Sequence, residues 1–243
     1  MLLRDGALSA WQRVYPLDGE PNPRTYFCGL ALALWLARPS HASTILVAHA
    51  GHDDSKDEND GWLVHCWQPM ESLRPHPSYH SVQLDAADLG RASALFSTRE
   101  AGSRNAVEGA FSLLWMALSD RWWPGRFIVL WTALEALFAP PSPGETTYRI
   151  SQRIALFLSD NSAECVELAR HVRRLYAMRS RVVHGHAVES VRRETLDDVT
   201  IQTETLLRRA LTRILDRKDV LAIFSGGERE RFLEELPLHR NWS

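Results

Sequence analysis

Five segments with apolar residues at helical spacing follow one another along the second half of the chain. They cover residues 105–121, 125–139, 146–159, 162–185 and 194–217. In each segment apolar residues return every three or four positions, which places them on one side of an α-helix. The connections are short, and PPSPGE at 140–145 holds three prolines. The pattern predicts an antiparallel bundle of four or five helices.

Residues 1–100 show a different pattern. In CGLALALWLA at 28–37 leucine alternates with smaller residues and Trp35, and this period of two predicts a strand, although leucine and alanine also favour helices. STILVAHA at 43–50 and GWLVHCWQ at 61–68 are short, rich in β-branched or aromatic residues and bounded by turn residues. We therefore expect a mainly α protein: a β-rich N-terminal region with a small antiparallel β element (residues 1–100), to which no role is assigned, and a helical domain (residues 101–243).

Charge, cysteine content and the length of apolar runs limit the partners and the location that this protein can have. A formal net charge of −2 gives no overall attraction to nucleic acid, yet residues 170–193 hold seven arginines and one glutamate. The three cysteines, Cys28, Cys66 and Cys165, are far apart and form no CxxC pair, which favours a reducing compartment. The apolar run at 28–37 is shorter than the roughly 20 residues that span a bilayer, and the first residues lack the apolar core of a signal peptide. We expect a cytoplasmic protein without a membrane segment.

An arginine interrupts the apolar series of the predicted helix 162–185. The series runs Cys165, Leu168, Val172, Leu175, Arg179 and Val182. An unpaired guanidinium on a buried face costs several kcal/mol. Arg179 therefore needs a carboxylate, an anionic ligand or a water-filled cleft.

A carboxylate is available in FIVLWTALEALFA at 127–139, which is apolar except for Thr132 and Glu135. Glu135 lies just beside the inward stripe of Phe127, Leu130, Leu134 and Leu137. The structural interpretation is an Arg179–Glu135 ion pair that fixes the register of the two helices. The functional interpretation makes both residues part of a site, and the sequence leaves both open.

A second line of polar side chains runs beside Arg179. Tyr176, Ser180 and His184 are spaced by four residues, so they are neighbours along one side of the helix. We expect the end of this helix to present a cation, a hydroxyl and an imidazole toward one cleft. Gly185 is the expected terminator and Ser162 the candidate N-cap.

Three of these segments carry a resemblance to a known family. RFIVLWTALEALF (126–138), TYRISQRIALFL (147–158) and LYAMRSRVVHG (175–185) follow one another on successive predicted helices. Together they resemble the HEPN superfamily, and most its Apea-like branch, over about residues 105–217. The resemblance implies a helical bundle that dimerises and, in active members, a metal-independent ribonuclease with an Arg-x4–6-His motif. Arg179 and His184 fit this motif, with Ser180 where active members often carry Asn, Asp or His.

The chemistry of these groups suits RNA cleavage by the 2′-hydroxyl. Histidine, with a pKa near 6.5, can act as the base, and a fixed arginine can bind the phosphate. One chain offers a single Arg–His pair, so a twofold homodimer would supply both base and acid. The expected catalytic residues are Arg179, His184, Ser180 and Glu135. The expected RNA-binding residues are Arg173, Arg174, Arg181, Arg149, Arg153 and Tyr176, with Arg192 and Arg193 nearby.

Alternatives remain at this stage. The arginines would form a solvated helix face in the simplest case, and Arg149 and Arg153 could pair with Glu135 instead of lining a cleft. The chain could be a non-catalytic HEPN module that binds RNA, nucleotide or a protein partner, or a purely structural dimerisation domain. The expected partners are RNA, a second copy of the chain and a protein of the same toxin or anti-phage defence system.

A metal site is the weakest candidate. His49, His52, Asp53 and Asp54 lie in HAGHDD, and His65 and Cys66 follow in the next predicted strand. A flexible acidic loop does not hold ligands in a fixed geometry. We expect neither a metal nor a cofactor.

Overall fold

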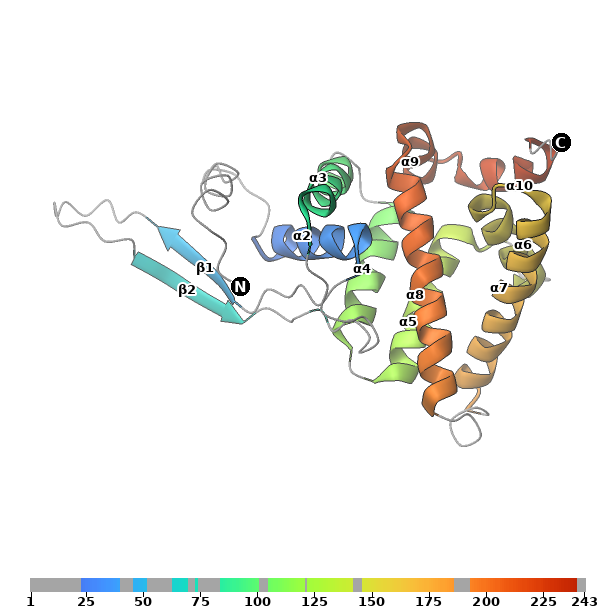
Figure 1. The fold of residues 1–243 in the computed structure, drawn as a ribbon, viewed down its shortest axis with the longest axis horizontal. Helices are drawn as coiled ribbons and strands as arrows, with labels where there is room; N and C mark the ends of the chain where they lie inside the picture. The colour runs from blue at the N-terminus through green and yellow to red at the C-terminus, as the bar shows by residue number, and fades with distance from the viewer. Residues whose placement is uncertain are drawn as a thin grey trace.

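The structure is a computed structural model (Figure 1), and it describes residues 23–39, 46–51, 63–69, 73, 84–100, 105–120, 122–141, 146–185 and 193–239. Within these ranges the protein is mainly helical. The helices are α2 (Pro23–Ala37), α3 (Ala86–Glu100), α4 (Ala106–Ser119), α5 (Trp123–Phe138), α6 (Thr146–Leu158), α7 (Ser162–Val183), α8 (Arg193–Leu215), α9 (Lys218–Ser225) and α10 (Arg229–His239). Two short strands, β1 (Leu46–Gly51) and β2 (Leu63–Pro69), pair antiparallel.

Helix α5 is the centre of the helical body. It contacts α4, α6, α7 and α8, and in Figure 1 α8 runs down the helical body in front of α5, with α4 to its left. Its predicted inward stripe is confirmed, because Phe127, Leu130, Leu134 and Leu137 are all fully buried. Burying a large apolar side chain stabilises a fold by about 1.5–3 kcal/mol. The five helices predicted between residues 105 and 217 are therefore present as α4 to α8, packed around a common core.

The N-terminal region differs from the prediction. Residues 28–37 do not form a strand: they lie in helix α2, which packs on α3, α4 and α8. Leu32, Trp35 and Leu36 are buried, and so are the small residues Ala31 and Ala33 between them. Alternation of leucine with alanine is compatible with a helix that is covered on most sides, and both residues have strong helix propensity. The β-rich character expected of residues 1–100 is not supported.

The ends of α7 are fixed by specific residues. The Asn161 side chain accepts a hydrogen bond from the Glu164 N–H at 2.9 Å, so Asn161 rather than Ser162 is the N-cap. Gly185 has φ 72°, a left-handed conformation in which glycine is tolerated without strain. Its N–H bonds the Val182 carbonyl at 3.1 Å. The predicted termination of this helix at Gly185 is confirmed.

Helices α9 and α10 close one end of the body over α5 and α6. Phe138, Phe157, Phe224 and Phe232 form a cluster whose neighbouring ring centroids are 5.4–6.5 Å apart. Nearby, the Leu158 carbonyl at the end of α6 accepts hydrogen bonds from Arg209 and Arg213 of α8. Cations at this position complement the negative end of the helix. Over the described part of the chain, no helix has both the length and the apolar character to cross a membrane.

Candidate functional site

The carboxylate of Glu135 holds two side chains of α7. Its Oε1 accepts a hydrogen bond from the Tyr176 hydroxyl at 2.8 Å, and its Oε2 lies 3.2 Å from Nη2 of Arg179. The guanidinium of Arg179 also lies over the Tyr176 ring, with Cζ 5.8 Å from the ring centroid. The predicted Arg179–Glu135 ion pair is confirmed, and Tyr176 completes it as a three-residue network between α5 and α7.

This network lies at the edge of the core. The Arg179 side chain is 25% exposed and that of Glu135 is 21% exposed. Below them the Tyr176 ring meets the buried Trp131 ring edge to face at 5.1 Å. The guanidinium is therefore anchored from the inside and still reaches solvent.

Burial and the neighbouring carboxylate change the acidity of Tyr176. Burial, followed by the hydrogen bond to Glu135, raises the pKa of Tyr176 to about 12. The phenol therefore stays protonated and acts as a donor to Glu135 at neutral pH. It is a buried packing and hydrogen-bonding residue in this protomer, and not the exposed RNA contact expected from the sequence.

His184 occupies the C-cap of α7, and its side chain is exposed. Its N–H bonds the carbonyl of Ser180 at 3.1 Å, and Ser180 itself is partly buried. An α-helix turns by about 100° per residue, so His184 is offset by about 40° from Ser180 and by about 140° from Arg179. Arg179 and His184 thus share one end of α7 but start from different sides of the helix.

Arg149 and Arg153 have partners other than Glu135. The buried Arg153 pairs with Glu230 of α10, with Nη1 3.1 Å from Oε2 and a second, shorter contact between Nη2 and Oε1. It also donates to the Phe138 carbonyl at 3.3 Å. Arg149 lies 3.5 Å from Glu234. Both arginines connect α6 to α10, and the expected alternative of pairing with Glu135 is wrong.

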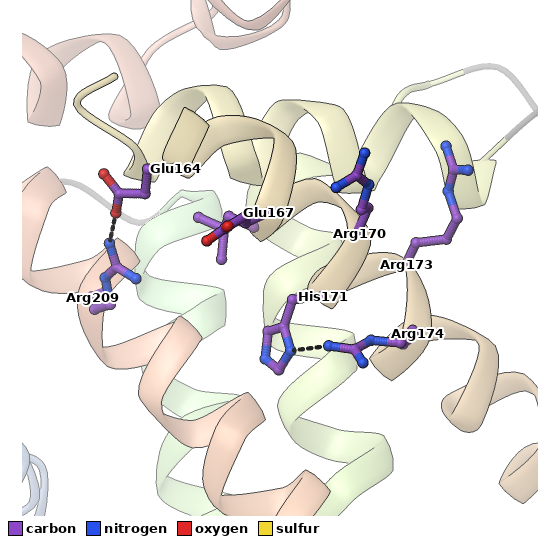
Figure 2. Close-up of a pocket in the computed structure, with 8 residues that line it drawn as sticks. Glu164, Glu167, Arg170, His171, Arg173, Arg174 and Arg209 are labelled. Atoms are coloured by element: carbon purple, nitrogen blue, oxygen red, sulfur yellow. Dashed lines mark hydrogen bonds and ion pairs between the residues drawn. The ribbon is translucent and has the colours of Figure 1, made fainter. Parts of the chain in front are cut away.

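The remaining expected RNA contacts lie on the outer side of α7. Arg173, Arg174 and Arg181 are exposed. A shallow depression of about 760 Å³ runs along this helix toward α8, and its lining residues are Glu164, Glu167, Leu168, Arg170, His171, Arg173, Arg174 and Arg209 (Figure 2). A second depression, of about 690 Å³, is lined by Thr146, Thr147, Tyr148 and Arg173. Neither depression includes His184.

His171 lies inside the first depression. Its Nδ1 is 3.4 Å from Nη2 of Arg174, as Figure 2 shows. Burial and then the nearby Arg174 charge lower the pKa of His171 below its usual value, so its ring is neutral at neutral pH. Its neutral nitrogen can accept a hydrogen bond from Arg174.

One buried polar pair escaped the sequence analysis. Arg126 near the start of α5 and Glu204 in the middle of α8 are both fully buried and form an ion pair at 2.5 Å. Arg126 also lies 5.0 Å from the Trp123 ring centroid. The sequence could have indicated Glu204, because this charged residue interrupts the buried stripe of α8 between Thr200 and Leu207. This pair joins two core helices and is remote in sequence from the motif.

Three of the six metal candidates cannot be placed. His52, Asp53 and Asp54 lie outside the described residues, and so does Arg192. His49 and Cys66 are register partners in the β1–β2 pair. Among the residues that the structure describes, no three His, Cys, Asp or Glu side chains are grouped as metal ligands would be.

Comparisons with protein-family models, curated protein sequences and solved structures gave no match to this chain. The resemblance to the HEPN superfamily therefore stays a prediction drawn from three sequence segments.

Proposed function

We propose that this protein is a metal-independent endoribonuclease of HEPN type that acts as a cytoplasmic homodimer in a toxin or anti-phage defence system. The observation that carries the proposal is the state of Arg179. An arginine on the apolar face of α7 is held by Glu135 and Tyr176 and yet is 25% exposed, on the same end of the helix as the exposed His184. A pre-oriented cation at the surface suits phosphate binding, because its orientation needs no further ordering.

In the proposed reaction the RNA supplies its own nucleophile. His184 accepts the proton of a 2′-hydroxyl, the 2′-oxygen attacks the adjacent phosphorus, and the bond from phosphorus to the 5′-oxygen breaks. The departing 5′-oxygen takes a proton from an acid, so the products are a 2′,3′-cyclic phosphate and a 5′-hydroxyl. Arg179 neutralises the charge that builds on the non-bridging oxygens. General base catalysis is typically worth about 10²–10⁴ in rate and electrostatic stabilisation about 10²–10³.

A dimer solves the orientation problem within one chain. Because Arg179 and His184 are offset by about 140° around α7, one protomer does not direct both at the same phosphate. A twofold axis near the end of α7 would place His184 of one chain beside Arg179 of the other. The same axis would make two equivalent sites, each with Arg179 of one chain and His184 of the other.

The decisive experiment is a cleavage assay on single-stranded RNA with analysis of the ends. We expect cleavage that survives EDTA, leaves 2′,3′-cyclic phosphate ends and is absent on 2′-O-methyl RNA. His184→Ala should lower the rate about 100-fold or more, whereas His239→Ala, on α10, should leave it unchanged. Equal cleavage of methylated RNA would exclude internal attack, and equal activity of His184→Ala would exclude this residue as the base.

A second candidate function is an RNA-binding module without catalysis. The observation that favours it is the exposed row of α7 arginines combined with the position of both depressions away from His184. This candidate expects RNA binding with no cleavage under any of the conditions above. The same RNA, tested for binding and for cut ends, separates the two functions.

A further inference from the structure

We propose that the outer face of α7 is a binding track for single-stranded RNA, in which Arg170, Arg173, Arg174 and Arg181 hold successive phosphates and Tyr148 stacks on a base. This inference rests on the proposed function and deepens it. It names the substrate form and the path by which the strand reaches His184.

Helix geometry places these arginines on one face together with His184. At about 100° per residue, Arg174 and Arg181 lie within about 40° of Arg170 around the helix axis, and Arg173 lies about 60° to the other side. His184 lies about 40° from Arg170, on the side of Arg173. Arg179 lies opposite, about 180° away. The catalytic imidazole thus belongs to the arginine face, not to the face that carries Arg179.

Among the residues that the structure describes, no carboxylate pairs with the arginines of this face. Arginines elsewhere in the fold pair with carboxylates: Arg38 with Asp88, Arg91 with Asp216, Arg126 with Glu204, Arg153 with Glu230, Arg209 with Glu164 and Arg213 with Asp160. Arg170, Arg173, Arg174 and Arg181 form no ion pair with a carboxylate of the described residues, although all four are exposed. Four guanidinium groups on one face, with no carboxylate partner in the described part of the chain, are suited to a polyanion.

Tyr148 adds a feature that phosphate binding alone does not need. It lies at the start of α6, is 49% exposed, and has the Arg173 guanidinium 5.3 Å from its ring centroid. Both depressions share Arg173, so this cation stands between the phosphate-binding face and the tyrosine ring. An exposed aromatic ring beside a planar cation is a stacking platform for an unpaired base.

The track has a defined end. Glu164 and Glu167 line the part of the first depression nearest the N-terminus of α7. There Arg209 forms an ion pair with Glu164 at 3.1 Å (Figure 2). These carboxylates repel phosphate, so the strand is bound from about Arg170 toward the C-terminus of α7. That distance, 14 residues at 1.5 Å each, is about 21 Å and accommodates several nucleotides.

Single-stranded RNA fits this surface better than a duplex or an acidic peptide does. In a duplex the bases are paired and stacked, so none is available to Tyr148, whereas an unpaired strand presents a base and a phosphate together. An acidic peptide could bind the arginines but has no use for the stacking platform. The tyrosine therefore decides between these ligands.

The test measures binding separately from cleavage. The probe is a labelled single-stranded 2′-O-methyl RNA of about twelve nucleotides, which keeps phosphates and bases but cannot undergo internal attack. Replacing Arg170, Arg173 and Arg174 together by glutamine should weaken binding about tenfold or more and reduce the salt dependence of log Kd by about 2, or about 0.7 per lost phosphate contact. Tyr148→Ala should weaken it about tenfold while Tyr148→Phe retains wild-type affinity.

The matched control removes the same charge elsewhere. Arg91, Arg217 and Arg231 are exposed, and each belongs to a surface ion pair. Their triple glutamine variant should bind RNA as the wild type does. Equal weakening by both triple variants, or an unchanged salt dependence in the α7 variant, would overturn the track.

The two proposals fail in different ways. Binding that depends on the α7 arginines without any cleavage of unmodified RNA would keep the track and remove the catalytic function. Cleavage that is unaffected by the α7 triple variant would do the reverse. A Tyr148→Ala variant with wild-type affinity would overturn the stacking platform, and preference for duplex RNA or an acidic peptide would overturn the single-stranded ligand.

Discussion

Arg179 and His184 lie five residues apart on α7 and about 140° apart around its axis, with Arg179 bound to Glu135 and His184 exposed at the C-cap. The two residues of the Arg-x4-His motif are therefore divided between the inner and outer sides of one helix. We therefore expect a mechanism that uses both on one phosphate to take them from two copies of the chain. This expectation can be tested directly.

Mixing two inactive variants should restore activity. If each site takes Arg179 from one chain and His184 from the other, a heterodimer of Arg179→Ala and His184→Ala has one intact site. Random exchange makes half of the dimers heterodimers, so activity should reach about a quarter of the wild-type value. The measurement is RNA cleavage after mixing and subunit exchange. Complete inactivity of the mixture, with heterodimers demonstrated by mass spectrometry, would show that each site uses residues of a single chain.

Tyr176 should ionise late in an alkaline titration of the folded protein. Its pKa is raised to about 12 in the folded protein, whereas an unfolded tyrosine ionises near pH 10. The unfolded state thus releases this proton first, so stability is fully present below about pH 10 and falls as the pH rises toward 12. Absorbance titration should show a late phase that disappears in Tyr176→Phe. A late phase that persists in this variant would contradict the assignment.

Breaking the Arg126–Glu204 pair should lower the free energy of unfolding strongly, whereas replacing both residues by apolar ones should lower it little. Either Arg126→Met or Glu204→Leu leaves a buried charge without its partner and should lower the free energy of unfolding by about 3–5 kcal/mol. The double variant Arg126→Met/Glu204→Leu should recover most of that loss, because no buried charge remains. Denaturant unfolding of the single and double variants measures the coupling. Additive losses in the double variant would show that the two residues act independently.

The link between α6 and α10 offers a matched comparison. Glu230 pairs with the buried Arg153, whereas the exposed Glu234 pairs with Arg149. Glu230→Gln should destabilise by about 2–3 kcal/mol because the buried Arg153 loses its close carboxylate and keeps only the more distant Glu234, 3.9 Å away. Glu234→Gln should cost about 0–1 kcal/mol, as surface pairs do. Thermal unfolding of both variants checks this difference, and equal losses would contradict it.

The sequence predicted the local features of the helical body well. The stripe of α5, the pairing of Arg179 with Glu135 and the end of α7 at Gly185 are confirmed. The stripe and the helix end depend on residues only a few positions apart. The ion pair follows from the free-energy cost of burying an unpaired charge in an apolar face. Such information is contained in a short stretch of chain.

Features that depend on distant partners could not be predicted in this way. Arg153 pairs with Glu230, 77 residues away, and Arg126 with Glu204 of another core helix. Which of many carboxylates meets a buried arginine is decided by helix packing, not by spacing in the sequence. The same holds for α2. The alternating pattern predicted a strand, but α3, α4 and α8 pack around this segment and make a buried helix favourable.

The aromatic cluster of Phe138, Phe157, Phe224 and Phe232 also constrains how the chain folds during its synthesis. The ribosome releases the rings of α5 and α6 well before those of α9 and α10. Until residues 224–232 emerge, Phe138 and Phe157 have no cover on this side, and Arg153 has no Glu230. A nascent chain at that stage exposes apolar surface that chaperones recognise. We expect this end of the bundle to close only after residues 224–232 are available to cover it.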